Sequence, residues 1–287
     1  MRLGEVVRQF ERPVPYAVSP DVFTGVDCRL ATLAGGRPRG IGTTVGRASI
    51  SGGQVLQASA LAQVVPSEFR RRLPWAHYLA RPGQVETVGK AAEDAMATGF
   101  LAASAGTGLD LGGIADRLMG DVQASALLDR RPPFRIARTR LRWTLERPDD
   151  GGRERAAFTI QEGQLRTLRL RSSSLTVAQA ADFAEDVARH DWLLTALTTM
   201  LDTSRLDLGM DERVVAKLRP AFDHLLHLWM PGARLDDQVQ GFWLSVERAS
   251  GFSRQWETQV SRVRDQLALH TITLLRAVAV KDAGSPE

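Results

Sequence analysis

After Ser174 the chain carries four successive runs in which apolar residues recur every three or four positions. This spacing places them on one face of an α-helix. The runs span residues 176–201, 211–229, 236–249 and from 253 onward. Because the connections between them are short, the sequence predicts a compact region resembling a four-helix bundle over 172–280. Pro220 is expected to kink or segment the second helix, and residues 281–287 are expected to be disordered.

Residues 134–171 follow a different period. In FRIARTRLRWTLE, mostly apolar residues alternate with arginines, so that Arg138, Arg140 and Arg142 share one face of a strand. A Pro-Asp-Asp-Gly-Gly turn follows, and two more β-type runs lie on either side of Gly163. These patterns predict a three-stranded antiparallel meander.

The signals before residue 134 are weaker. A β-type run, a Ser-Gly-Gly turn and a second run predict a hairpin over 39–65, and a helix is predicted at about 114–128. Residues 1–36 are expected to be irregular apart from one short strand within 5–10, because three prolines interrupt them. Residues 83–113 give no clear pattern. The predicted fold class is therefore α+β, with an antiparallel β-rich region over 1–171 preceding the helical region.

The charge is distributed unevenly along the chain. Hydrophobic residues make up 44% and charged residues 24%, which is the composition of a globular protein with a buried core. Residues 129–171 contain twelve arginines and six acidic residues, whereas residues 172–287 carry a formal charge of −4. The predicted meander is thus a compact basic segment.

The basic strand face is one candidate site. Arg169 and Arg171 on the third predicted strand would join Arg138, Arg140 and Arg142. Such a face can contact phosphates and release their counterions, which indicates nucleic-acid binding. This face lacks the aromatic side chains on which bases usually stack. A solvated face, or one docked on an acidic surface, therefore remains the alternative interpretation.

The histidines of the helical region form a second candidate. His190 lies beside Asp191, and further histidines follow at His224, His227 and His270. A helical bundle can gather such side chains into a metal site, which would favour a metal-dependent hydrolase. The Glu-x-x-His pairs of di-iron bundles are missing, however. The competing interpretation is that these histidines form hydrogen bonds between helices.

Other motifs for catalysis or cofactor binding are incomplete. Residues 83–90 resemble a phosphate-binding loop, but they have one residue too many and Ala91 stands where a serine or threonine is required. The chain contains no G-x-S-x-G nucleophile motif. Cys28 is the single cysteine, which excludes an intramolecular disulfide and a thiolate metal cage. We therefore expect no cofactor and favour a protein that is not an enzyme.

The hydropathy of the sequence predicts the cellular location. The N-terminal residues mix charged and apolar side chains, and no segment has the apolar length of a membrane-spanning helix. The expectation is a cytoplasmic protein without a membrane partner.

Several segments resemble a known group of proteins. They read TGVDCRL, LPWAHYLARPG, HDWLLTALTTML, LRPAFDHLLHLWMPGA and RQWETQVSRVRDQLALHTITLL. These segments resemble an uncharacterised family of actinobacterial proteins that is abundant in streptomycetes. The resemblance covers nearly the whole chain. The family has no assigned activity. Its genes lie beside other uncharacterised genes, including one for a variant P-loop protein, so the resemblance implies a protein partner encoded nearby.

Three functions are therefore open. The first is a non-enzymatic cytoplasmic adaptor in a multi-gene actinobacterial system, which the incomplete catalytic motifs and the segregated charge favour. The second is nucleic-acid binding through the arginine face. The third is metal-dependent hydrolysis by the histidines of the helical region.

Overall fold

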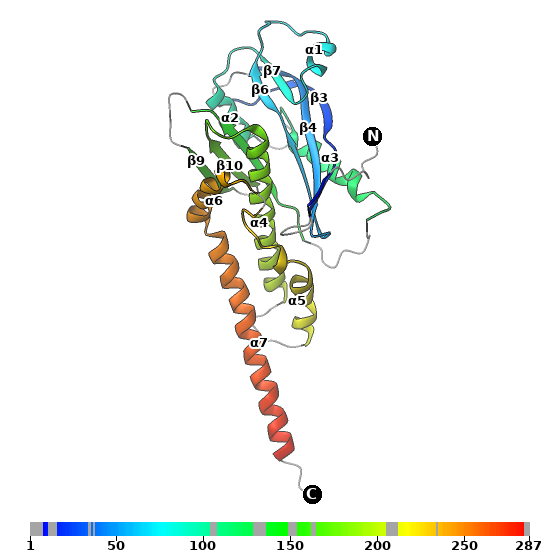
Figure 1. The fold of residues 1–287 in the computed structure, drawn as a ribbon, viewed down its shortest axis with the longest axis vertical. Coiled ribbons are helices and arrows are strands. Elements are labelled where there is room, and N and C mark those ends of the chain that lie inside the picture. Colours follow the sequence, from blue (N-terminus) through cyan, green and yellow to red (C-terminus); the bar gives the residue numbers. More distant parts are fainter. Residues whose placement is uncertain are drawn as a thin grey trace.

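The computed structural model shows a mixed α+β protein (Figure 1). The described residues are 8–10, 16–33, 36, 38–103, 108–128, 136–148, 154–161, 165–204, 212–233 and 235–283. Strands prevail in the N-terminal part and helices in the C-terminal part, as predicted. The molecule is elongated, with a large sheet towards one end and the last helix extending from the other end (Figure 1).

The large sheet is built around one long strand, β4 (Arg39–Ser51). The other strands are β1 (Arg8–Phe10), β2 (Tyr16–Val18), β3 (Val22–Arg29), β5 (Val55–Leu61), β6 (Gln63–Pro66) and β7 (Gln84–Val88). Strand β4 pairs antiparallel with β2, β3, β5 and β7, whereas β6 joins β7 in parallel. The predicted hairpin over 39–65 is confirmed in β4 and β5, which meet at a turn through Gly52 and Gly53.

The expectation of irregular structure over residues 1–36 is wrong, because β2 and β3 lie there. Strand β3 alternates half-buried and exposed residues along its length. The sequence does not show this alternation as an apolar-polar pattern, because the apolar Phe23 faces outward and the polar Thr24 faces inward. The short strand expected within 5–10 is present as β1 in its described part.

The close approach of β4 and β7 requires a glycine. Gly42 pairs with Val85, and a Cβ atom on Gly42 would lie 2.0 Å from the carbonyl oxygen of Gln84. Any side chain at this position would therefore push the two strands apart.

The small sheet corrects the predicted antiparallel meander over 134–171. Its strands are β8 (Arg140–Glu146), β9 (Arg155–Ile160) and β10 (Leu165–Arg171), and β10 lies in the middle. It pairs antiparallel with β9 but in parallel with β8. Period-two alternation identifies the strands but carries no information about their order, which explains the error.

Three short helices accompany the strands, so the N-terminal region is less purely β than predicted. They are α1 (Trp75–Leu79), α2 (Glu93–Ala102) and α3 (Leu111–Gln123). The helix expected at about 114–128 is α3, which begins earlier because Asp110 caps it by accepting a hydrogen bond from the Gly113 amide at 2.9 Å.

The C-terminal helices largely follow the predicted boundaries. They are α4 (Val177–Ser204), α5 (Glu212–His224), the 3₁₀ turn η3 (Leu226–Leu228), α6 (Asp237–Ser250) and α7 (Phe252–Ala283). A four-helix bundle is not confirmed. Helix α4 contacts the other three helices but also both sheets. Pro220 lies inside α5, and the expected disorder of 281–287 is wrong as far as Ala283, where α7 ends.

Helix α7 continues well beyond the body of the protein (Figure 1). Gly251 adopts a left-handed φ of 64° and separates α6 from α7. Trp256 anchors the first turns of α7 by stacking on Trp229, with ring centroids 4.3 Å apart. Among the described residues, no helix has both the length and the hydropathy to cross a membrane.

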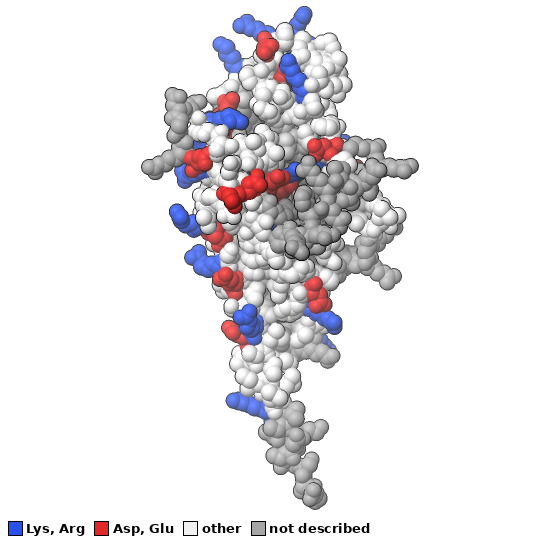
Figure 2. All heavy atoms as spheres, in the orientation of Figure 1, with Lys and Arg blue, Asp and Glu red and all other residues white. Residues whose placement is uncertain are grey.

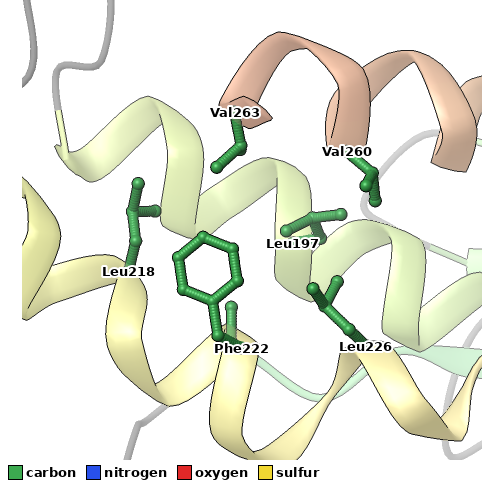
Figure 3. Close-up of a pocket in the computed structure, with 7 residues that line it drawn as sticks. Leu197, Leu218, Phe222, Leu226, Val260 and Val263 are labelled. Carbon is green, nitrogen blue, oxygen red and sulfur yellow. The ribbon is translucent and has the colours of Figure 1, made fainter. Parts of the chain in front are cut away.

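The junction of α4, α5 and α7 is packed with apolar side chains, as Figure 3 shows. They are Leu197, Leu218, Phe222, Leu226, Val260 and Val263. The space between them is about 10 Å³, which is about the room that one water molecule occupies. This junction therefore belongs to the core and is too small for a ligand.

An ion pair joins the large sheet to α4. Arg47 on β4 contacts Glu185 at 2.7 Å and also contacts Asp182. Glu185 is 4% exposed and accepts a further hydrogen bond from Ser59 on β5. Burial by itself lowers the pKa of the Arg47 guanidinium, but the two carboxylates outweigh burial and raise that pKa.

Replacing Glu185 with Gln should therefore destabilise the fold. The change leaves Arg47 without its buried counter-charge, so we expect the free energy of unfolding to fall by about 3 kcal/mol in urea titrations. The control is Asp223→Asn, which removes the exposed ion pair with Arg219 and should change stability by less than about 0.5 kcal/mol. Equal effects of the two changes would contradict the role of Glu185.

Candidate functional site

The middle of α4 carries an unusual run of buried ionisable side chains. Glu185, Asp186, Arg189, His190 and Asp191 are each 4% exposed or less. Such groups are rarely buried without partners, because removing a charge from water is costly. Each must therefore be matched by a polar or charged group, either within α4 or on a neighbouring element.

Asp186 binds partners near its own position and on a distant loop. It accepts a hydrogen bond from the Gly232 amide at 2.9 Å and pairs with Arg189. His190 Nδ1 donates to the Asp186 carbonyl oxygen at 2.8 Å. These contacts fix the loop before α6 against α4.

Asp191 and Arg166 form the charged floor of a cleft. Arg166 Nε lies 2.7 Å from Asp191 Oδ2, and the Arg166 guanidinium donates to the Thr195 hydroxyl at 3.1 Å. Both charged side chains are less than 10% exposed. Burial raises the pKa of Asp191 to about 6, although Arg166 acts in the opposite direction. A buried carboxyl group with a raised pKa in a cleft is a feature of functional sites.

The cleft lies where β9, β10, α4 and the corner between α6 and α7 meet. Its volume is about 400 Å³. Apart from the floor, the lining consists of apolar and neutral polar side chains: Phe158, Thr159, Ile160, Leu194, Thr195, Thr198, Thr199, Ala249, Ser250, Phe252 and Gln255. This volume falls in the range of small-molecule sites.

The predicted arginine face exists, and several of its side chains contact neighbouring elements, although Arg138 and Arg140 remain more than half exposed. Arg142 donates to the carbonyl oxygens of Phe100 and Ala103 in and after α2. Arg140 pairs with Asp116 of α3 at 2.6 Å, and Arg138 donates to Gln123 of the same helix at 2.8 Å. These arginines therefore attach helices to the small sheet.

The two arginines of β10 that were predicted to join this face differ from each other. Arg169 binds both carboxylate oxygens of Glu146 at 2.7 Å and also contacts Asp94 of α2. The Glu146 carboxylate raises the pKa of Arg169, and burial opposes it. Arg171 lies at the end of β10 and is exposed.

The predicted histidine site is not assembled by the fold. The ring of His190 packs edge-on against Trp229 and Trp243, with ring centroids 5.0 and 5.3 Å away. Its neighbour Asp191 is directed instead to Arg166. His190 is thus held in the aromatic core of the helical region.

The remaining histidines lie on other elements. His224 ends α5, His227 lies in η3, and His270 lies on the part of α7 that leaves the body. Within the described part of the chain, no group of three or more metal-ligating side chains comes together. The structure therefore gathers no ligand set from these residues.

Arg166 was not among the predicted site residues. This residue shares a strand face with Leu168 and Leu170, which are fully buried. An arginine on the apolar face of a strand indicates a buried partner, and that signal was present in the sequence. The partner itself could not be found, because Asp191 lies on a different element 25 positions later.

The part of α7 that projects from the body, which includes residues 269–275, exposes large apolar side chains. Leu269, Ile272, Leu274 and Leu275 are between 46% and 64% exposed. Because each residue turns the helix by about 100°, these side chains lie on more than one face. Figure 2 shows few charged side chains on this part of the molecule.

Comparison with known proteins gives no relative. No protein-family model matches the chain, and no curated protein or solved structure is significantly similar to it.

The titration of Asp191 can be measured directly. We expect the ¹³C resonance of its carboxyl group to titrate at about pH 6, because burial disfavours the charged form. The folded state then holds a proton that the unfolded chain releases, so this group lowers stability as the pH rises from about 4 to 6. Glu154 is the control, since hydrogen bonds from Ser174 and Ser172 lower its pKa. Titration of Asp191 below pH 4 would contradict its burial beside the cleft.

Replacing Arg138, Arg140 and Arg142 with Gln tests the nucleic-acid interpretation. These side chains already contact Asp116, Gln123 and carbonyl groups, so the salt concentration that elutes the protein from heparin should fall only slightly, by the amount that the lost exposed charge explains. If the arginines contacted phosphates, elution would shift to much lower salt, because each lost contact reduces counterion release. The melting temperature, recorded in parallel, should fall by a few degrees, since two helices lose contacts to the small sheet.

Proposed function

We propose that the protein is a non-enzymatic cytoplasmic adaptor and that the projecting part of α7 is the element that binds its partner. The observation that carries this proposal is the exposure of four large apolar side chains over residues 269–275. A helix that is apolar on several sides is normally buried. One flat contact does not cover these side chains, so the partner must surround the helix.

The charges beside this segment favour a different protein over a second copy of this chain. Arg262, Arg264 and Arg276 are exposed, and Asp265 is the one acidic residue between positions 262 and 276. Two such segments would repel each other. An apolar groove with an acidic rim on another protein matches both the side chains and the charge.

The body of the protein supports this proposal by holding α7 in place. Phe252, Trp256 and Val263 are buried, so the first half of the helix is anchored. The resemblance to an actinobacterial family directs the search for the partner to products of neighbouring genes, including the variant P-loop protein.

Two leucines on α7 provide the test. In the double variant Leu274→Asp and Leu275→Asp, the amount of partner recovered from a native host should fall at least about tenfold, because burying a leucine contributes more than 1.4 kcal/mol. The control is Leu127→Asp, which changes a leucine that is 84% exposed after α3 and should leave recovery unchanged.

Cross-linking identifies the contact itself. A photoreactive amino acid at Leu275 should cross-link one protein, and treatment with nuclease should not remove it. If the cross-link joined two copies of this chain, the adaptor proposal would be wrong, and the exposed part of α7 would serve self-association instead. If the double variant retained its partner, α7 would not be the binding element.

A further inference from the structure

The cleft above Arg166 and Asp191 has a net charge close to zero. These two residues are the charged members of its described lining, and they lie 2.7 Å apart. Arg166 would attract an anion and Asp191 would repel it, and the reverse holds for a cation, so the pair gives a charged ligand little net attraction to offset its loss of hydration. Because both interactions act in a partly desolvated site, the cleft favours an uncharged molecule.

The polar lining offers donors and acceptors side by side. Asp191 provides carboxylate oxygens, and Thr195, Thr198 and Ser250 carry hydroxyl groups that can donate as well as accept, while Arg166 contacts Asp191 and Thr195. A ligand hydroxyl can donate to the carboxylate and also accept from a neighbouring donor. A molecule with several hydroxyl groups therefore fits this lining better than one with donors alone or acceptors alone.

The remaining lining is apolar. The rings of Phe158 and Phe252 pack edge-on, with their centroids 5.1 Å apart. Ile160 and Leu194 extend this apolar lining. The C–H faces of a sugar ring can pack on such side chains while its hydroxyl groups reach the polar lining. The volume of about 400 Å³ accommodates one or two rings.

We propose that this cleft binds a neutral polyhydroxylated molecule of the size of a monosaccharide or disaccharide. The proposal is independent of the adaptor function, because the cleft is lined by the first residues of α7 and the partner-binding segment begins at Leu269.

The test uses sugars that differ in charge. Neutral hexoses and their disaccharides, glucuronate and glucosamine are titrated into the full-length protein at pH 7.5, and methyl resonances of Leu194 and Ile160 are followed by NMR. We expect a neutral sugar to shift these resonances and both charged analogues to bind more weakly. Failure of every neutral sugar to bind, or equal binding of a charged analogue, would overturn the proposal.

Variants at the rim of the cleft test sugar binding without changing a fully buried side chain, so that loss of binding can be distinguished from loss of folding. Thr198→Val removes one hydroxyl group and should weaken binding about fivefold, which is the contribution of one hydrogen bond. Ala249→Trp fills the cleft from an exposed position and should abolish binding. The control is Thr258→Val on α7, whose hydroxyl donates to the Arg254 carbonyl outside the cleft. If both cleft variants bound sugar as the control does, the binding site would lie elsewhere.

Discussion

The burial of five ionisable side chains in two turns of α4 is the constraint on which the rest of the structure depends. Glu185 is matched by Arg47 of the large sheet, Asp186 by the Gly232 amide, and Asp191 by Arg166 of the small sheet. Each partner comes from a different part of the chain. Burying these charges is tolerable only if all the partners arrive together, so α4 specifies how the two sheets and the following helices are arranged.

The two features proposed for function follow from this arrangement. The cleft has a charged floor because Asp191 and Arg166 meet where the small sheet contacts α4. Helix α7 leaves the body at a defined position because its first turns pack into the same core, where Trp256 stacks on Trp229. A packed body that carries an exposed apolar helix is suited to present that helix to another protein. The cleft provides a separate surface on which a small molecule can bind.

The sequence predicted the elements better than their arrangement. The helical period identified α4 to α7, and the alternation of arginines identified β8, because both patterns are local. The parallel pairing of β8 with β10 was not predictable, since it depends on contacts between distant residues. The same limit applies to the candidate sites. Arg138, Arg140 and Arg142 share a face as expected, yet the acidic and carbonyl partners that occupy them lie on α2 and α3. His190 was named as a ligand candidate because it lies beside Asp191 and other histidines follow it; its aromatic neighbours Trp229 and Trp243 are distant in sequence, so its core position could not be recognised. The cleft was missed for the same reason.

Native-state hydrogen exchange tests the central role of α4 most directly. If the buried charges join the parts of the molecule, the amides of residues 185–191 should belong to the slowest group and exchange only through global unfolding. Their opening free energy should then equal the free energy of unfolding from denaturant titration. Exchange of these amides through local opening, while those of β4 remain protected, would contradict the account.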